Sequence, residues 1–365
     1  MSNRTETGRT FAVLVCVIVL GHLLSGQQLS PLAAASGGEE ERAQAAAEDE
    51  AAAPAPAPAP ARAAGEAGKW KLVWSDEFDK DGALDETKWT QEEGFIRNHE
   101  LQYYTKARRE NARVEDGFLV IEARKERFPN ARFESPRSRD WRRSKEFAEH
   151  TSASVTTKGR ADWKRGRIEV RAKLPQGRGV WPAIWMLGTN IDEVGWPRCG
   201  EIDIMEYVGF EPNMLYANVH TGRYNHTRGT GKGDKRETRR PYDDFYVWAL
   251  EWYDDRLDIL VDDEKLFSYR KESDDPAVWP FDQPHYLILN LAIGGAWGGQ
   301  KGVDEEIFPQ KFLIDYVRVY ELAEKSAKPA AKGEEREEGA SGNEEEPAKK
   351  KGEGKKGEGE KQKAE

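Results

Sequence analysis

Three acidic residues lie close together in the stretch GEIDIMEY, residues 200–207: Glu201, Asp203 and Glu206. Side chains alternate between the two faces of a strand, so Glu201 and Asp203 share a face while Glu206 is one residue out of phase. In an unbroken strand Glu206 would lie among the neighbouring isoleucines in a core, where an unpaired carboxylate is unfavourable. A β-bulge just after Asp203 would return Glu206 to the face of the other acids and move Met205 off it.

Two glutamates that face one cleft can hydrolyse a glycosidic bond. In the retaining reaction their carboxyl groups lie about 5–5.5 Å apart, one as nucleophile and the other as acid/base. In-phase positions four residues apart have backbones roughly 13 Å apart, a gap that two glutamate side chains leaning together can largely close. Three clustered acids do not all ionise readily, so shared protons could keep one glutamate protonated and another ionised. A solvated strand face or a calcium site is the alternative interpretation of this spacing.

Tryptophans surround the acidic stretch. Trp181 and Trp185 share a strand face in GVWPAIWMLG, residues 179–188, and Trp196 comes shortly before the acids. Aromatic faces are what sugar rings stack on, but large aromatic side chains are also common in protein cores. Both interpretations, a sugar platform and a core, stay open for each of the three.

The elements that must position these residues are short strands. Between residues 69 and 322, apolar segments of five to nine residues, many of them alternating, are separated by Gly, Pro, Asp or Asn. Long helical periodicity and repeats of fixed period are absent, which disfavours an α/β fold, a propeller or a solenoid. We therefore predict one all-β sandwich domain over 69–322. The Arg-rich stretch 127–147 fits no strand and is expected to form a long surface loop.

The two ends of the chain differ in composition from this block. Residues 1–36 contain two arginines before an apolar run at 11–24, which is typical of a signal peptide or an uncleaved anchor. Residues 37–68 are rich in Ala, Pro and Glu and predict a stiff disordered linker, and residues 323–365, rich in Lys and Glu, predict a disordered tail. We expect an exported protein that is periplasmic, extracellular or tethered to the envelope.

The net charge and the motifs of the chain argue against nucleic acids, anionic membranes and nucleotides as binding partners. The 365-residue chain has a formal net charge of -10 and a pI near 5.4, opposite to what nucleic acids and anionic membranes attract. The stretch GTGKGDK lacks the Gly-x4-Gly-Lys-Ser/Thr frame of a phosphate loop, so no nucleotide is expected. Cys199 is the one cysteine outside the N-terminal apolar run and is expected to be a small buried side chain.

Several motifs together resemble one known family. They are DEFD, LDETKW, NHELQYYT, GRIEVRAKLPQGRGVWPAIWMLG, WPRCGEIDIMEYVG, LILNLAIGGAWGG and IDYVRVY, in the family's order across 69–322. The sequence resembles glycoside hydrolase family 16 in its laminarinase-like branch. The resemblance implies a concanavalin-like jelly roll of two curved antiparallel sheets, with an open polysaccharide cleft on the concave face. It also implies a retaining endo-hydrolase of β-1,3- or mixed β-1,3/1,4-glucan. We further expect a monomer that requires no cofactor.

The resemblance assigns roles to individual residues. Glu201 matches the nucleophile, Glu206 the acid/base and Asp203 the acid that hydrogen-bonds and tunes the nucleophile. In LYANVHTG, strand parity places Asn218 and His220 on one face. The family and the strand pattern together nominate nine substrate-binding residues: Asn98, Glu169, Arg171, Trp181, Trp185, Trp196, Asn218, His220 and Trp297.

Two features leave alternatives open. Some family members carry a calcium ion away from the cleft, in a region that the acids of DEF and Asp315 resemble, so the resemblance also raises a structural calcium as an expectation. The stretch 218–237 is long and basic and should form a loop at the cleft rim, which leaves the exact polysaccharide open. The alternatives are a hydrolase of an agarose- or carrageenan-type polymer, a transglycosylase, or a non-catalytic carbohydrate-binding sandwich.

Overall fold

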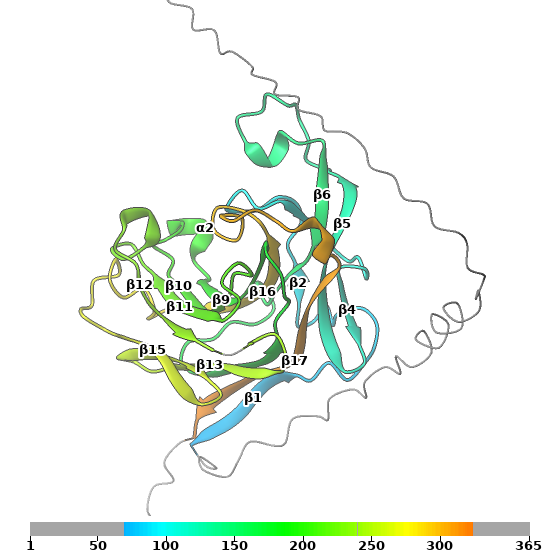
Figure 1. Ribbon diagram of the computed structural model, residues 1–365. Coiled ribbons are helices and arrows are strands. Elements are labelled where there is room, and N and C mark those ends of the chain that lie inside the picture. Colours follow the sequence, from blue (N-terminus) through cyan, green and yellow to red (C-terminus); the bar gives the residue numbers. More distant parts are fainter. Residues whose placement is uncertain (1–68, 239, 324–365) are drawn as a thin grey trace, which may run out of the picture. The chain divides into compact units, whose positions relative to one another are not determined.

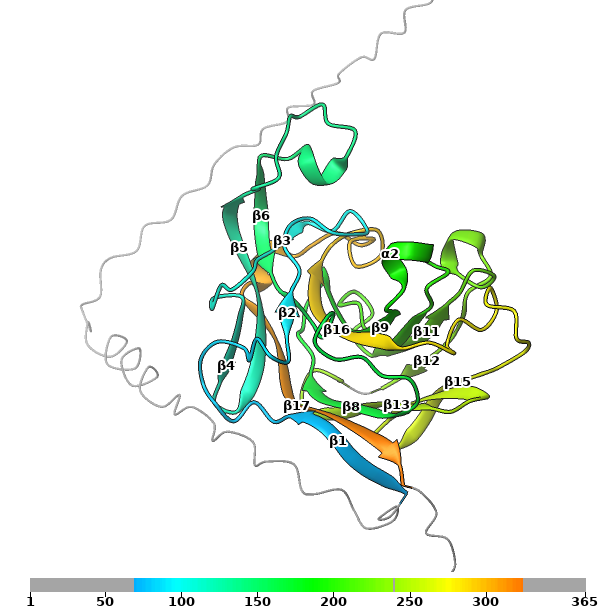
Figure 2. The ribbon, with the colours of Figure 1, turned by 180° about the vertical axis from the view of Figure 1, so that it is seen from behind.

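Two β-sheets packed face to face contain all seventeen strands of the computed structural model, which describes residues 69–238 and 240–323 (Figures 1 and 2). The predicted jelly-roll sandwich is confirmed. The predicted leader at 1–36, the linker at 37–68 and the tail after Ala323 lie outside the described residues. Within the described part of the chain, no helix is long and apolar enough to cross a membrane.

The seven-stranded sheet carries the acidic stretch on a central strand. Its order is β12 (Lys232–Glu237), β11 (Met214–His220), β10 (Glu201–Glu206), β9 (Val180–Gly188), β16 (His285–Ile293), β7 (Ser154–Thr156) and β2 (Thr90–Gln91). All neighbouring strands in it are antiparallel.

The ten-stranded sheet covers the other side of the core. Its order is β15 (Glu264–Arg270), β14 (Arg256–Val261), β13 (Tyr246–Trp252), β8 (Gly166–Lys173), β17 (Gln310–Leu322), β5 (Phe118–Pro129), β6 (Phe147–Ser152) and β3 (Gln102–Tyr104). β1 (Trp70–Asp76) pairs with β17 and β4 (Ala112–Glu115) with β5. One contact, between β3 and β6, is parallel.

Helical structure is confined to short turns in the connections. The described chain contains α2 (Ile191–Val194) and the 3₁₀ turns η2 (Trp141–Arg143), η3 (His226–Arg228) and η4 (Glu305–Ile307). These turns lie in the connections between strands (Figure 1). Ile191 and Val194 of α2 pack against a cluster that includes Trp185 on the outward face of the seven-stranded sheet.

Alternating side chains from both sheets form the core. Ile168 and Val170 of β8 meet Ile184 of β9 and Ile202 of β10 in one buried cluster, together with Trp248 of β13. All five side chains are fully buried. Burying an aliphatic side chain of this size contributes about 1.5–3 kcal/mol, so the period-two pattern fixes which face of each strand points inward.

A β-bulge interrupts β10 directly after Asp203. Against β9, Asp203 pairs with Trp185 while Met205 pairs with Ile184, so one extra residue is accommodated in β10. The pairing with β11 shifts over the same stretch. Met205 is fully buried in the core cluster. The predicted bulge is therefore confirmed, and it places Glu206 on the same face as Glu201 and Asp203.

Candidate active site

A cleft of about 790 Å³ crosses the face of the seven-stranded sheet that points away from the core. Its size falls within the usual range of ligand sites. Its lining comes from β9, β10, β11 and β16 and from four connecting segments, at residues 97–100, 191–196, 226–231 and 296–300. The lining residues include Asn98, Trp181, Trp185, Trp196, Glu201, Asp203, Glu206, Asn218, His220 and Trp297.

The two glutamates lie at either end of the acidic row and accept hydrogen bonds from cleft residues. Trp196 Nε1 donates to Glu201 Oε2 at 2.7 Å. Glu206 accepts from Trp181 Nε1 at 3.2 Å and from Asn218 Nδ2 at 2.9 Å. Each glutamate is thus held by an indole that also forms part of the cleft wall, so residues predicted as sugar platforms also orient the acids.

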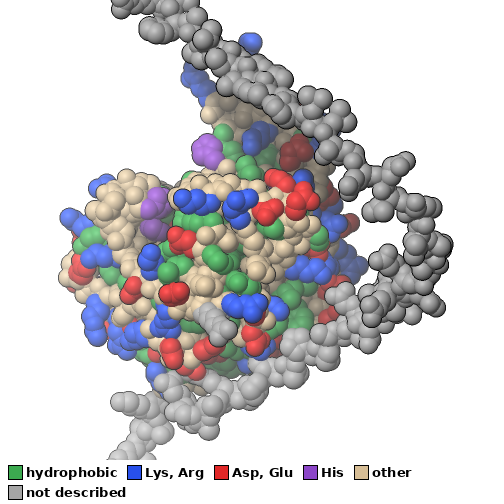
Figure 3. Space-filling view, in the orientation of Figure 1, with side chains coloured by type: hydrophobic (Ala, Val, Ile, Leu, Met, Phe, Trp, Pro, Cys, Tyr) green, Lys and Arg blue, Asp and Glu red, His purple; other side chains and the backbone are tan. Residues whose placement is uncertain are grey.

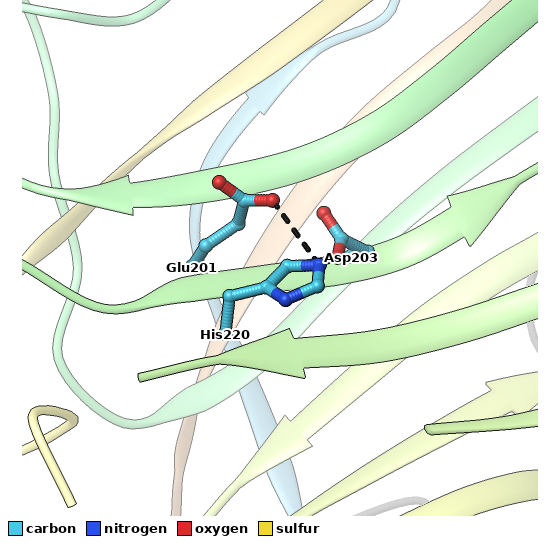
Figure 4. A group of neighbouring side chains, drawn as sticks. All are labelled: Glu201, Asp203 and His220. Carbon is cyan, nitrogen blue, oxygen red and sulfur yellow. Dashed lines mark ion pairs between the residues drawn. The ribbon is translucent and has the colours of Figure 1, made fainter. Parts of the chain in front are cut away.

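His220 lies beside the first two acids, on the neighbouring strand β11. Its Nε2 is 3.6 Å from Glu201 Oε1 and 3.3 Å from Asp203 Oδ2 (Figure 4). The three side chains converge because Glu201 pairs with His220 across the two strands. Their ligand-type atoms lie within 4.8 Å of one another, so this group could hold a metal ion, although glycoside hydrolysis by paired carboxyl groups uses none.

Burial raises the pKa of all three acids. Loss of hydration and the nearby Asp203 carboxyl raise the pKa of Glu201 to about 8. Loss of hydration, then the charge of Glu206, raise the pKa of Asp203 well above its usual value, and burial also raises the pKa of Glu206. The acids therefore retain protons that isolated carboxyl groups would lose, as expected for clustered acids in a desolvated site.

Asn98 and Trp297 reach the cleft from loops. Asn98 and His99 both have positive φ angles, 55° and 52°, in the left-handed region that asparagine tolerates better than most residues. Trp297 packs edge-on against Trp181 at 5.5 Å and against Tyr216 at 4.9 Å between ring centroids. The prediction placed Asn98 and Trp297 at the cleft, and both line it.

Glu169 and Arg171 are the two predicted substrate-binding residues that the structure places elsewhere. They lie on β8 in the ten-stranded sheet, on the face opposite the core residues Ile168 and Val170. Glu169 accepts from Arg167 Nε at 2.5 Å, and Arg171 donates to Asp315. The prediction is wrong for both, because parity shows that a side chain leaves the core but not which sheet carries it.

A buried hydrogen-bond network under the cleft was missed from the sequence. Trp185 Nε1 donates to Asn290 Oδ1 at 2.7 Å, and Asn290 Nδ2 donates to the hydroxyl of Tyr104 at 3.0 Å. That hydroxyl reaches Glu100 at 3.3 Å, which also accepts from Asn98 at 3.2 Å. Asn290 could have been found, because it is the one strongly polar side chain inside the apolar run LILNLAI.

The sequence prediction missed two other cleft residues, Arg97 and His226. It also expected a loop over the basic stretch 218–237, and only part of that stretch is a loop. Arg97 places its guanidinium 4.9 Å from the Trp185 ring centroid. His226 lies at the rim, 5.2 Å from Trp196 and 5.1 Å from His220 between ring centroids. Residues 226–231 form part of the rim as predicted, whereas residues 232–237 are the edge strand β12.

The basic stretch has a glycine at position 233, on β12, because Asn218 leaves no room for a side chain there. It pairs with Asn218, and a Cβ at this position would lie 2.0 Å from Asn218 Oδ1. Any larger residue would therefore displace the amide that donates to Glu206.

The acids nominated for calcium already have cationic partners. Asp76 lies 3.3 Å from Lys88 Nζ, Glu77 lies 2.7 Å from Arg318, and Asp315 accepts from Arg171. A calcium ion would have to compete with these cations for the carboxylate oxygens, and a structural calcium at this position stays a prediction.

Cys199 is fully buried and unpaired, as predicted. Burial raises the pKa of its thiol to about 12, which keeps the thiol protonated and unreactive.

An acidic row and indoles on the concave face of a β-sandwich define a carbohydrate-processing protein, and the comparisons identify its family. A model of glycosyl hydrolases family 16 matches residues 99–318. A beta-glucanase of Rhodothermus marinus is 47% identical over 268 residues, covering 71% of this chain and 88% of that protein. The chain belongs to glycoside hydrolase family 16 and is a glycoside hydrolase.

Solved structures agree with this assignment. The laminarinase of Rhodothermus marinus has a TM-score of 0.63 and 46% identity, covering 70% of this chain and 98% of its own. A non-specific endo-β-1,3(4)-glucanase, co-crystallised with a β-linked oligosaccharide at its active site, has a TM-score of 0.62 and 44% identity. That match covers 69% of this chain and 95% of the other.

Proposed function

We propose that this chain is an exported, retaining endo-hydrolase of β-1,3-glucan or mixed β-1,3/1,4-glucan that acts through a covalent glycosyl-enzyme intermediate. The observation that carries the proposal is the bulge after Asp203. It brings Glu206 onto the cleft face with Glu201, on one strand and under one set of indole donors. A binding module without catalysis has no need of two glutamates in this arrangement.

In the proposed first step, the Glu201 carboxylate attacks the anomeric carbon while Glu206 donates its proton to the departing glycosidic oxygen. Burial favours the protonated form of Glu206 before substrate cleavage, as this role requires. In the second step Glu206 removes a proton from water, which releases the sugar from Glu201 with its anomeric configuration retained.

Asp203 is proposed to hold a proton and donate a hydrogen bond to Glu201. It is the most buried of the three acids, 2% exposed, and its pKa is raised well above the usual value by loss of hydration and by Glu206. Loss of hydration and the Asp203 carboxyl raise the pKa of Glu201 to about 8. A proton held by Asp203 removes the neighbouring negative charge that contributes to this rise, so Glu201 can ionise and act as the nucleophile.

Export is proposed from the sequence alone. It is supported by the arginines and the apolar run near the N-terminus, which are typical of a secretory leader. A polysaccharide too large to enter a cell also requires its hydrolase outside. We further propose that the enzyme acts as a monomer and needs no cofactor for hydrolysis.

Two measurements test the chemistry and the substrate. Proton NMR of the first product should show the β-anomer before mutarotation; an initial α-anomer would contradict the double displacement. Laminarin and lichenan should be shortened to mixed oligosaccharides, whereas agarose and carrageenan should not. Cleavage of the latter polymers alone would instead assign a different polysaccharide to the same catalytic residues.

A further inference from the structure

An arm, defined as residues 127–147, consists of the outer end of the β5–β6 hairpin and the loop that connects its strands, and it extends beyond the sandwich (Figures 1 and 2). The prediction that 127–147 fits no strand is wrong for residues 127–129 and 147, which belong to β5 and β6. The arm contains seven Lys and Arg and three acidic residues, in a chain whose net charge is -10. Lys and Arg side chains are visible at this protruding end of the molecule (Figure 3). Neither the fold nor the proposed hydrolysis accounts for this local excess of positive charge.

Some of the arm's cations are neutralised within it and others are not. Arg142 is paired with Asp140, and Arg143 with Glu134. Arg132, Arg137 and Arg139 are exposed and form no ion pair with any residue in the described ranges. Arg127 and Lys145 also form no ion pair with described residues, but they lie over the rings of Phe147 and Phe95. Arg132, Arg137 and Arg139 are therefore the three guanidinium groups of the arm that remain available to an external anion.

The arm has a defined conformation. Asn130, only 5% exposed, donates from Nδ2 to the carbonyl oxygens of Arg142 at 2.9 Å and Lys145 at 2.8 Å, which ties the two ends of the loop together. Asp140 caps η2 by accepting from the backbone of Arg142. These bonds hold the exposed arginines on one framework, which reduces the ordering entropy lost when they bind.

The short turn η2 within the arm packs against the loop that lines one end of the cleft. Trp141 of η2 packs on His99 with 4.6 Å between ring centroids and on Phe95 with 5.9 Å. His99 directly follows Asn98, which lines the cleft. A polysaccharide that leaves the cleft past Asn98 would therefore continue toward the arm.

We propose that the arm is a secondary binding site for carboxylate or sulfate groups carried by a polysaccharide. The proposal deepens the function proposed above and rests on it for the path of the sugar chain. Guanidinium groups match planar carboxylates and sulfates with paired hydrogen bonds, and an exposed cationic surface raises the local concentration of an anionic polymer. The enzyme would accordingly act best on β-glucan that carries acidic groups or is mixed with an acidic polysaccharide.

Kinetics on a neutral and an acidic form of one glucan test whether the anions lie on the substrate chain. In the full chain, the triple variant R132Q/R137Q/R139Q should raise KM for carboxymethyl-β-1,3-glucan about tenfold at low salt, since each exposed charge pair contributes little and three are removed together. Its kcat, and both constants on laminarin, should match the unmodified enzyme. Raising NaCl from 50 to 500 mM should remove the difference.

A matched control removes the same charge elsewhere. Lys71, Lys80 and Lys164 are exposed and form no ion pair with described residues, and none lines the cleft. The variant K71Q/K80Q/K164Q should leave KM on carboxymethyl-glucan unchanged. An equal rise in both triple variants would show a general effect of net charge and overturn the proposal.

Affinity electrophoresis in gels containing alginate tests the second source, a separate acidic polymer. The unmodified chain should be retarded and the arm variant should not, even if the carboxymethyl-glucan kinetics show no difference. If the unmodified chain and the arm variant behave alike in both assays, the proposal is overturned. It is also overturned if double-stranded DNA retards the unmodified chain as strongly as alginate does. Failure to cleave laminarin would instead refute the proposed function, while the gel still reports on the arm.

Discussion

The concave face of the seven-stranded sheet, which holds the cleft, and the convex outer face of the ten-stranded sheet both carry acidic side chains. The acids on the convex face are paired with arginine, whereas those on the concave face are not. On the convex face, Arg167 is 1% exposed and donates to Glu169, to Glu251 at 2.8 Å and to Asp263 at 2.6 Å. On the concave face, Glu201 and Asp203 share the imidazole of His220, and none of the three acids of β10 has an arginine or lysine within 4 Å among the described residues. Both sheets therefore carry acids on an outward strand face. Of these two groups, only the acids of β10, in the seven-stranded sheet, are buried without an arginine or lysine partner.

The pKa shifts follow this difference in charge compensation. Although burial opposes it, the hydrogen bond and charge of Arg318 lower the pKa of Glu77 on the convex side. Burial and the neighbouring acid raise the pKa of Glu201. Paired acids stabilise the fold, whereas unpaired buried acids cost stability and gain reactivity, as is common at active sites.

The largest expected effect is on catalysis. Glu201→Gln and Glu206→Gln should each lower kcat on laminarin by at least about a thousandfold, because general acid–base and nucleophilic roles contribute factors of this order. Glu169→Gln, on the convex face, serves as the control and should keep kcat within about twofold. Full activity in either cleft variant would refute the assigned roles.

The next effect is on stability and concerns the convex face. Arg167→Met removes the cation shared by three acids, and breaking a buried ion pair on one side costs about 3–5 kcal/mol. Urea denaturation should report this loss, while kcat measured well below the melting temperature stays unchanged. A variant as stable as the parent would show that the convex acids do not need this cation.

A smaller effect is expected from the network beneath the cleft. Asn290→Ala leaves the Trp185 indole N–H unpaired and frees the ring that forms the cleft floor. An unsatisfied buried donor costs about 1–3 kcal/mol, so we expect lower stability and a KM on laminarin raised about threefold to tenfold. Because the acids are untouched, kcat should change little; a fall in kcat without a change in KM would contradict a positioning role.

The smallest expected effect is a pH dependence of stability with opposite sign on the two faces. Glu201 has a pKa of about 8 in the folded protein, above its ordinary value of 4.5, so the fold loses stability as pH rises between these values. Glu201→Gln should remove this loss and melt a few degrees higher than the parent at pH 8 but not at pH 4.

Glu77→Gln provides the reverse case. Its folded pKa is lowered, so its stabilising contribution is present above the unfolded pKa and disappears as pH falls through the folded pKa. The variant should therefore melt lower than the parent at neutral pH, with the difference shrinking in acid. Melting curves from pH 3 to 8 would check both variants, and the same sign in both would refute the contrast between the faces.

Most of the site could be predicted because the sequence shows the alternation of side chains along each strand and one departure from it, at Glu206. The out-of-phase Glu206 required a bulge, and Trp181, Trp185, Asn218 and His220 followed from alternation on β9 and β11. The same rule failed for Glu169, because any outward-facing residue of a sandwich has the same pattern whichever sheet it belongs to. Arg97 and His226 come from loops, which have no period to read.

The sequence by itself determined the all-β class, the inward face of each strand and the bulge, because these depend on residues close together in the chain. Only the tertiary structure decided which outward face became the cleft, how Asn290 and Tyr104 meet under Trp185, and where the basic arm lies. Those features depend on contacts between segments far apart in sequence, whose geometry is set by the packing of the two sheets. Charge compensation is of the same kind, since Arg167 reaches Glu251 and Asp263 only after folding.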